Sequence, residues 1–464
     1  MTVTVAPRGG QSLRELLHDA GFRLPSDCGG AGTCGKCRVR ILDAAGERSI
    51  LACQHVPVAP VVVSAEMGPI GRMRRRPARR ESAVLRLAAD IGTTTISLAA
   101  VDMSQRRVVA RDEALNPQMV FGSDVINRIA AGKKIHRARL EPELLRFMDE
   151  QGIPSGRPVV AVGNTVMAHF LMGRSAASLG EFPYKSLLPL RRRLSHRRGG
   201  IQFEMLPLLG PFVGSDCTAA ILASGMYRSP RLSLLVDAGT NGEVVLGNRE
   251  RMLVTSTAAG PAFEGATLEC GSLAQTGAIR AVRHDRYRFR PSVVGGGEAK
   301  SICGSGVLDA VAEAVRVGKV EASGRIVESA RLNVSTGQRP VFLSQSDIRD
   351  VQLAKGAIAA AIQVLLAEWG ASAEEVERVH VTGRFGASMS PKSAERIGLL
   401  PPMQRNRMRR HGNLALLGAA KATLEPLLFE EAERFASNCR EVMLSSHPQF
   451  EQAFIDSMRL EPWN

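Results

Sequence analysis

The sequence predicts an α/β protein with two related halves, preceded by a small α+β domain. From Val84 onward, strand and helix patterns alternate to the end of the chain, which is typical of α/β architecture. An apolar strand followed by Asp-x-Gly-Thr occurs twice, at Asp90 and at Asp237, and this repeat indicates two halves. Four of the eight cysteines fall between residues 28 and 53, which sets the N-terminal segment apart.

Residues 1–66 read as an independent unit. Thr2–Val5 forms a short strand, Ser12 caps a helix that runs to Ala20, and further strands are expected at 38–41 and 61–63. Strands around one helix at this length predict a β-grasp fold. Residues 67–83 carry six arginines between positions 72 and 80, together with Gly and Pro, and no apolar period, so we expect a linker there.

The cysteines Cys28, Cys34, Cys37 and Cys53 are spaced C-x5-C-x2-C-x15-C. Three ligands in one tight loop and a fourth beyond a hairpin resemble the plant-type ferredoxin arrangement of a [2Fe–2S] cluster, with a first gap one residue longer. Interspersed glycines let the backbone wrap closely and point N–H groups at the sulfurs. A zinc site remains the alternative, although zinc modules usually present two C-x-x-C pairs.

Asp-x-Gly-Thr after a strand suits phosphate binding. The carboxylate at the strand end can hold Mg²⁺, the glycine permits a tight turn, and the following N–H and hydroxyl groups face phosphates. We therefore predict Asp90, Asp237 and Glu243 as catalytic residues, Glu243 being the nearest candidate for a general base. The predicted phosphate-binding residues are Gly92, Thr93, Thr94, Thr95, Gly239, Thr240, Asn241 and Gly242.

A third motif, Val379–Ser388, is a buried strand that ends in glycines, among them Gly383 and Gly386, before a helix. It resembles the adenosine motif of the acetate kinase/sugar kinase/Hsp70/actin superfamily, whose motif order this chain follows. The resemblance implies two ribonuclease-H-like halves, over 84–205 and 206–464, and hinge helices after Gly122 and Gly412. The segments 260–266 and 303–309 each put glycines at an expected helix start, a ready anion site, and either line the nucleotide cleft or only pack. The segment Phe212–Asp216 places a carboxylate in a glycine turn, as a candidate group to bind Mg²⁺ or to position water.

Charge and composition bear on whether the protein binds nucleic acid or a membrane. Lys+Arg is 60 against Asp+Glu 45, a net charge of +15, but Arg abundance indicates compositional bias, and 4% aromatic residues offer few base-stacking platforms. We expect no nucleic acid as a partner. No uncharged apolar run reaches the roughly 18 residues of a membrane span, and the N-terminus lacks a signal pattern, so we expect no membrane and a cytoplasmic protein.

An N-terminal ferredoxin joined to an actin-like ATPase resembles the reductive activators of corrinoid proteins. That resemblance implies a [2Fe–2S] cluster, ATP and Mg²⁺ as cofactors, and ATP-dependent one-electron reduction of Co(II)-corrinoid to Co(I). The implied partners are a corrinoid protein or cobalamin-dependent methyltransferase, methionine synthase among them, and an upstream low-potential reductase; a homodimer is left open. The alternatives are an electron donor of the dehydratase-activator type and a non-enzymatic ferredoxin-linked sensor.

The reduction potentials explain why a ferredoxin domain would be joined to an ATPase. A plant-type cluster has a potential of about −400 mV, and the resemblance implies that the Co(II)/Co(I) couple lies lower still. Each 100 mV uphill costs roughly 2.3 kcal/mol per electron. Coupling to ATP hydrolysis can therefore shift an equilibrium at which a ferredoxin alone would stall.

Overall fold

The computed structural model describes the chain except for residues 1, 9, 21, 25–29, 31, 33–36, 44–45, 65–67, 70–83, 123, 138, 240, 266–267, 286, 328, 337–339, 403 and 464. The chain divides into two units, one of Met1–Ala219 with Gly418–Glu433 and the other of Ala220–Leu417 with Arg434–Asn464. The predicted linker lies almost wholly outside the described residues.

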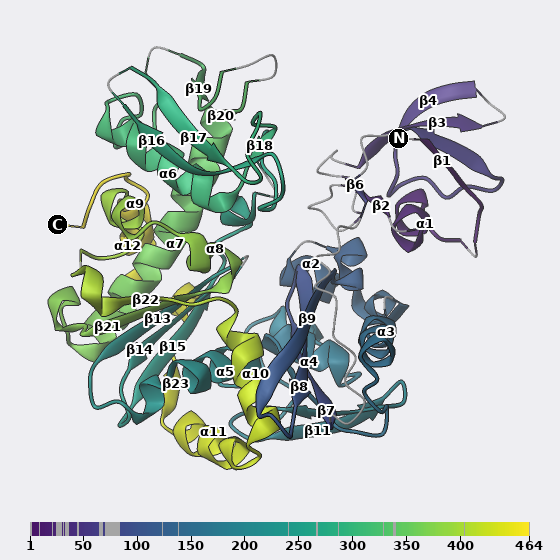
Figure 1. Ribbon diagram of the computed structural model, residues 1–464, viewed down its shortest axis with the longest axis horizontal. Helices are drawn as coiled ribbons and strands as arrows, with labels where there is room; N and C mark the ends of the chain where they lie inside the picture. Colours follow the sequence, from purple (N-terminus) through teal and green to yellow (C-terminus); the bar gives the residue numbers. More distant parts are fainter. Residues whose placement is uncertain are drawn as a thin grey trace. The chain divides into compact units, whose positions relative to one another are not determined.

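The N-terminal region is a four-stranded sheet in the order β1-β5-β3-β4 with helix α1 (Leu13–Asp19) packed on it (Figure 1). Leu13 and Leu17 of α1 are fully buried in one core with Val39, Ile41 and Val63 of the sheet. The strands are β1 (Thr2–Val5), β3 (Arg38–Asp43), β4 (Gly46–Leu51) and β5 (Val61–Ser64), with a separate pair β2 (Phe22–Arg23) and β6 (Gly68–Pro69). The predicted β-grasp fold is confirmed.

The first unit also holds a six-stranded sheet in the order β11-β12-β10-β7-β8-β9. Its strands are β7 (Leu85–Ile91), β8 (Thr95–Asp102), β9 (Arg107–Leu115), β10 (Val159–Val162), β11 (Leu194–Arg198) and β12 (Ile201–Met205). The helices are the 3-10 helices η1 (Pro117–Phe121) and η2 (Gly132–Arg137), with α2 (Val125–Ala130), α3 (Glu141–Gln151), α4 (Thr165–Leu171) and α5 (Ser215–Ser224).

The second unit is built on a six-stranded sheet in the order β22-β21-β13-β14-β15-β23. Its strands are β13 (Ser233–Ala238), β14 (Gly242–Gly247), β15 (Met252–Thr257), β21 (Arg378–Thr382), β22 (Met408–Arg410) and β23 (Cys439–Glu441). Two smaller sheets use β16 (Ala278–His284), β17 (Phe289–Val293), β18 (Ser301–Ile302), β19 (Arg331–Asn333) and β20 (Phe342–Ser344). The later helices are α6 (Gly304–Arg316), α7 (Gln345–Trp369), α8 (Gly383–Ser388), α9 (Pro391–Arg396), α10 (Leu414–Leu424), α11 (Leu427–Ser437) and α12 (Phe450–Ser457). Helices α5, α10 and α11 each contain residues of both units.

The two large sheets share one plan. In the first, β7 pairs antiparallel with β8 and parallel with β10; in the second, β13 pairs antiparallel with β14 and parallel with β21. The repeated Asp-x-Gly-Thr pattern therefore marks the same hairpin in both halves, and the prediction of two related halves is confirmed. The helices expected after Gly122 and Gly412 are α2 and α10.

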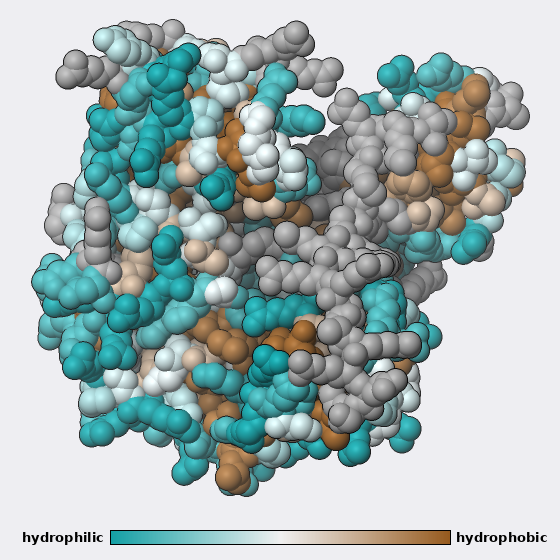
Figure 2. All heavy atoms as spheres, viewed as in Figure 1, coloured by the Kyte–Doolittle hydropathy of each residue, from teal (hydrophilic) through white to brown (hydrophobic). Residues whose placement is uncertain are grey.

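Helix α7 is long and apolar enough to cross a membrane, but 78% of its apolar window is buried inside the protein, as in a core helix. Among the described residues it is the one helix that meets this criterion. On the face drawn in Figure 2, hydrophilic residues predominate and apolar ones form scattered patches.

Candidate functional site

Two of the four predicted cluster cysteines lie in the described part of the chain. The Sγ atoms of Cys37 and Cys53 are 3.2 Å apart. That separation exceeds a disulfide bond of about 2.05 Å and lies within about 0.5 Å of the spacing of roughly 3.7 Å between thiolates that share a tetrahedral metal. The pair therefore fits two ligands of one iron; Cys28 and Cys34 lie outside the described residues.

The first phosphate motif is the tight turn between β7 and β8. Asp90 is the penultimate residue of β7 and pairs with Ser97 across the hairpin. The N–H of Gly92 donates to the carbonyl of Thr95 over 2.9 Å, and a Cβ on Gly92 would lie only 2.8 Å from that oxygen. The turn at 92–95 therefore requires glycine.

Three buried polar side chains from outside the motif hold this turn. The Nδ2 of Asn116 donates to the carbonyl of Gly92 over 2.8 Å, and the Nδ2 of Asn164 donates to the Thr93 hydroxyl over 3.0 Å. Arg128, fully buried, donates through Nη2 to the carbonyl of Thr93. Burial lowers the pKa of Arg128 to about 9, against the opposing charge of Asp124, so the side chain is still a cation at neutral pH.

The segment Phe212–Asp216 lies beside the first phosphate turn. Strand β10 runs parallel to β7 with Val162 opposite Asp90, so both strands end at the same edge of the sheet. A Cβ on Gly214 would lie 2.4 Å from the Cα of Asn164, and the N–H of Ser215 donates to the carbonyl of Gly163. Asp216, in the first turn of α5, is thereby brought to this edge.

The second phosphate motif is the hairpin of β13 and β14. Asp237 and Glu243 are directly opposed in its register, and Gly242 pairs with Ala238. Opposed residues of an antiparallel pair project to the same face, so both carboxylates share one face of the sheet. Glu243 is buried and its Oε1 accepts from the Ser256 hydroxyl over 3.3 Å.

Gly239 and Asn241 occupy the turn itself, while Thr240 lies outside the described residues. A Cβ on Gly239 would come within 3.8 Å of Oε1 of Glu264, so the 260–266 segment reaches the second phosphate turn.

The predicted adenosine motif meets the second phosphate motif through strand register. Strands β13 and β21 are parallel with Asp237 opposite Thr382. The next residue, Gly383, has φ +88°, and a Cβ there would lie 2.5 Å from Oδ1 of Asp237. Only a glycine backbone can pass so close to the carboxylate. Gly386 is likewise constrained, because a Cβ would lie 2.8 Å from Cγ1 of Val381.

The two undecided glycine segments of the second unit both pack around the adenosine motif. Phe263 stacks on Phe385 of that motif, with ring centroids 4.4 Å apart and planes 7° apart. Gly304 begins α6 against the carbonyl of Phe263, which a Cβ would overlap at 1.7 Å. The helix start predicted at 303–309 is confirmed, whereas the 260–266 segment forms only a 3-10 turn, Ala262–Glu264.

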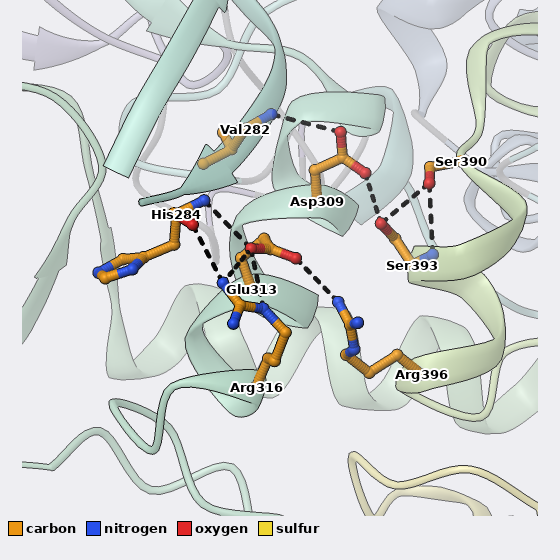
Figure 3. Close-up of polar contacts among 8 residues, drawn as sticks. All are labelled: Val282, His284, Asp309, Glu313, Arg316, Ser390, Ser393 and Arg396. Atoms are coloured by element: carbon orange, nitrogen blue, oxygen red, sulfur yellow. Dashed lines mark hydrogen bonds and ion pairs between the residues drawn. The ribbon is translucent and has the colours of Figure 1, made fainter. Parts of the chain in front are cut away.

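Two carboxylates on α6 fasten the helix that follows the adenosine motif (Figure 3). Asp309 accepts from the hydroxyl of Ser393 on α9 over 2.6 Å and from the N–H of Val282 over 3.3 Å. Glu313, one turn later, accepts from Nη1 of Arg396 on α9 over 2.8 Å. Burial raises the pKa of Asp309. Helix α9 is thus held to the helix that starts in the 303–309 segment.

A histidine pair lies at the base of the same motif. Nδ1 of His380 on β21 is 3.0 Å from Nε2 of His411. When both rings are neutral, one of these nitrogens donates its N–H to the other. Burial, with the neighbouring charges of His411, Arg378 and Arg409, lowers the pKa of His380 to about 4. This histidine is therefore neutral at pH 7 in the folded protein.

The depressed pKa of His380 predicts acid sensitivity of the second unit. Because the unfolded chain binds this proton near pH 6.5 and the folded chain near 4, stability is fully present above pH 6.5 and is lost as pH falls toward 4. Between pH 7 and 5 the loss is about 2 kcal/mol. Urea unfolding followed by fluorescence of Trp369 and Trp463, both in the second unit, measures it. His380→Asn should show a drop smaller by that amount; equal drops would contradict the assignment.

Comparison with known proteins gives three successive matches to family models. Residues 1–58 match a 2Fe-2S iron-sulfur cluster binding domain, residues 85–229 the RACo middle region, and residues 231–463 the C-terminal domain of RACo, the ASKHA domain. A solved structure titled "Reductive activator for corrinoid,iron-sulfur protein" covers 99% of this chain and 97% of its own, with a TM-score of 0.74 and 24% identity, and shows the same fold.

Two curated relatives extend these matches. The corrinoid activation enzyme RamQ of Eubacterium limosum is 32% identical over 384 residues, which are 73% of this chain and 64% of that protein. The Co(II) methylated amine-specific corrinoid protein reductase of Methanosarcina barkeri is 30% identical over 241 residues, 47% of this chain and 44% of that protein. This chain therefore spans less than two thirds of either relative's length.

Proposed function

We propose a function from the premise that this chain belongs to the RACo family, whose middle region and C-terminal ASKHA domain it contains. The chain acts in the cytoplasm as an ATP-hydrolysing reductive activator: it passes one electron to the Co(II)-corrinoid of a partner protein and yields Co(I). One ATP-dependent cycle consumes one electron from an upstream low-potential reductase. No other group is oxidised or reduced.

Two arrangements in one chain support this proposal. The cysteine sulfurs of Cys37 and Cys53 lie at ligand spacing, and the register of β13 with β21 joins Asp237 to Gly383. Cys28, Cys34, Cys37 and Cys53 would hold a [2Fe–2S] cluster, which would supply a one-electron carrier with a reduction potential of about −400 mV. The chain's own part is to hold the sulfurs close and to exclude water, as the burial of Cys37 does.

The proposed ATP-binding residues have separate roles toward Mg²⁺, the phosphates, the adenosine and the attacking water. Asp90 and Asp237 would hold Mg²⁺ from the ends of β7 and β13, and the backbone amides of the turn at 92–95 and of Gly239, Asn241 and Gly242 would face the phosphates. Gly383 and Gly386 let the backbone approach the adenosine. Glu243 shares a face with Asp237 and orients the water that attacks the terminal phosphate, giving ADP and phosphate.

The test mixes the full chain with ATP, Mg²⁺, a low-potential reductant and a cognate corrinoid protein, and follows the cobalt spectrum. We expect Co(I) to form with ATP and at a rate at least ~10-fold lower without it, since an uphill electron transfer needs the coupled hydrolysis. Equal Co(I) formation without ATP would refute the coupling.

The same mixture separates the alternatives. ATP hydrolysis that drives reduction of a cobalt-free low-potential acceptor, with cobalt unchanged, would identify an activator of the dehydratase type. Absence of ATP hydrolysis with and without partner would favour a ferredoxin-linked sensor.

A further inference from the structure

Arg14 is an arginine of the cluster domain that is 93% shielded from solvent, since only 7% of it is exposed. Arg14 lies on α1, but two carbonyl groups that its guanidinium binds belong to residues 105 and 106 positions further along the chain. Nη1 donates to the carbonyl of Val120 over 2.8 Å, and Nη2 donates to that of Met119 over 2.9 Å. Both acceptors are in the last turn of η1, where the negative end of the helix dipole attracts cations; the Met119 carbonyl also accepts from the N–H of Gly122 over 3.2 Å.

Helix η1 is attached directly to the first phosphate turn. Its N-cap is Asn116, whose N–H donates to the carbonyl of Thr94 over 2.9 Å and whose Nδ2 donates to that of Gly92 over 2.8 Å. At the other end, Arg128 joins the carbonyls of Gly122 and Thr93. A displacement of the turn at 92–95 therefore moves the carbonyls that Arg14 binds.

On the cluster side, α1 is attached to the segment that carries Cys53. The N–H of Leu13 donates to the carbonyl of His55 over 2.7 Å, and the N–H of Arg14 to that of Ala52 over 3.0 Å. A Cβ on Gly30 would lie 3.7 Å from Nη1 of Arg14 and 3.8 Å from Cβ of Cys53. The guanidinium and this cysteine therefore face the same point of the chain.

We infer that Arg14 is a positioning residue that couples the cluster domain to the nucleotide: it docks α1 on η1, and nucleotide binding at the 92–95 turn changes the strength of that docking. The inference rests on the proposed function in one respect, that nucleotide binds at this turn. The contact between Arg14 and η1 has two states, formed and released. The nucleotide site and the cluster site each shift the equilibrium between these states, because continuous hydrogen bonds connect both sites to the contact.

Coupling of this kind is reciprocal. If nucleotide changes the docking of α1, then removal of the docking changes the affinity for nucleotide by the same factor, although Arg14 is not in the phosphate or adenosine motifs. Two bonds from a charged donor are enough for a factor of 10 or more.

The experiment measures two quantities on the full chain with cluster, with and without Mg²⁺ and a non-hydrolysable ATP analogue. These are amide hydrogen exchange in α1 and η1, and the midpoint potential of the cluster. In the unmodified protein we expect the nucleotide to change α1 exchange at least tenfold and to shift the potential. In Arg14→Gln, both responses should vanish and the dissociation constant of the analogue should change at least tenfold; Arg14→Lys, which can reach one carbonyl, should recover part of each.

Two controls isolate the path. Arg40→Gln removes an arginine from the same domain whose side chain is 71% exposed, and should leave every response intact. Asn116→Ala weakens the link between the turn and η1 without touching the cluster domain, because it removes the side-chain bond to the carbonyl of Gly92 and keeps the backbone bond to Thr94. If both residues lie on one path, the double variant Arg14→Gln/Asn116→Ala responds like either single variant. The visible spectrum of the cluster checks that the domain is folded.

The outcomes are distinct. Failure of the unmodified chain to bind the analogue would overturn the proposed function. Binding of the analogue with unchanged α1 exchange and potential, or an Arg14→Gln variant that keeps both responses, would overturn the coupling role of Arg14 alone.

Discussion

Asp237→Asn is expected to lower Mg²⁺-dependent ATP hydrolysis by about 100-fold or more, which is the scale on which loss of one transition-state charge contact acts. The carboxylate stands at the end of β13, opposite Glu243 and against the backbone of Gly383. Asparagine keeps the size of the side chain, so the strand register should survive while the negative charge is lost. Phosphate release at saturating ATP measures the effect.

Asp285→Asn is the matched control for this variant. Asp285 lies between β16 and β17, which belong to a different sheet from the strands that carry Asp237 and the adenosine motif, and it binds Arg290. Its replacement should leave hydrolysis unchanged. Undiminished ATPase activity in Asp237→Asn, with normal folding, would show that the second phosphate site is misplaced.

The hairpins that carry Asp90 and Asp237 could be predicted because their signals are local. An apolar strand, a carboxylate, a glycine and a second β-rich run are contiguous in sequence, and a tight turn between strands follows from sterics. The helix after Thr382 could be predicted for the same reason. The predicted domain bounds and the roles of these site residues remain predictions.

The residues that fix the first phosphate turn could not be predicted in the same way. Asn116 and Asn164 carry a local signal, since each caps a helix, but their second bonds to the turn depend on strand order. Arg128 carries no such signal: an arginine on a short helix is usually solvated, and its burial follows from the packing of α2. The approach of Gly383 to Asp237 depends on pairing between β13 and β21, whose paired residues are 145 positions apart in sequence.

Cys53→Ser and Cys37→Ser are each expected to abolish the cluster, and with it all electron transfer to a corrinoid protein. Iron–sulfur clusters require soft thiolate ligands, and a serine hydroxyl is both harder and protonated at neutral pH. Protein purified anaerobically should contain about two irons per chain when unmodified, and lose the red-brown absorbance in either variant. Iron analysis and the visible spectrum measure the loss.

Each variant has a control of similar exposure. Cys439 is 2% exposed against 1% for Cys37, and its thiol donates to the carbonyl of Phe435, a bond that serine can keep. Cys270 is partly exposed, as Cys53 is. Serine at either position should leave iron content unchanged, because neither residue lies in the 28–53 segment. Stoichiometric zinc without iron in the unmodified, anaerobically prepared protein would instead establish a zinc site, and with it the loss of the one-electron carrier on which reduction of Co(II) depends.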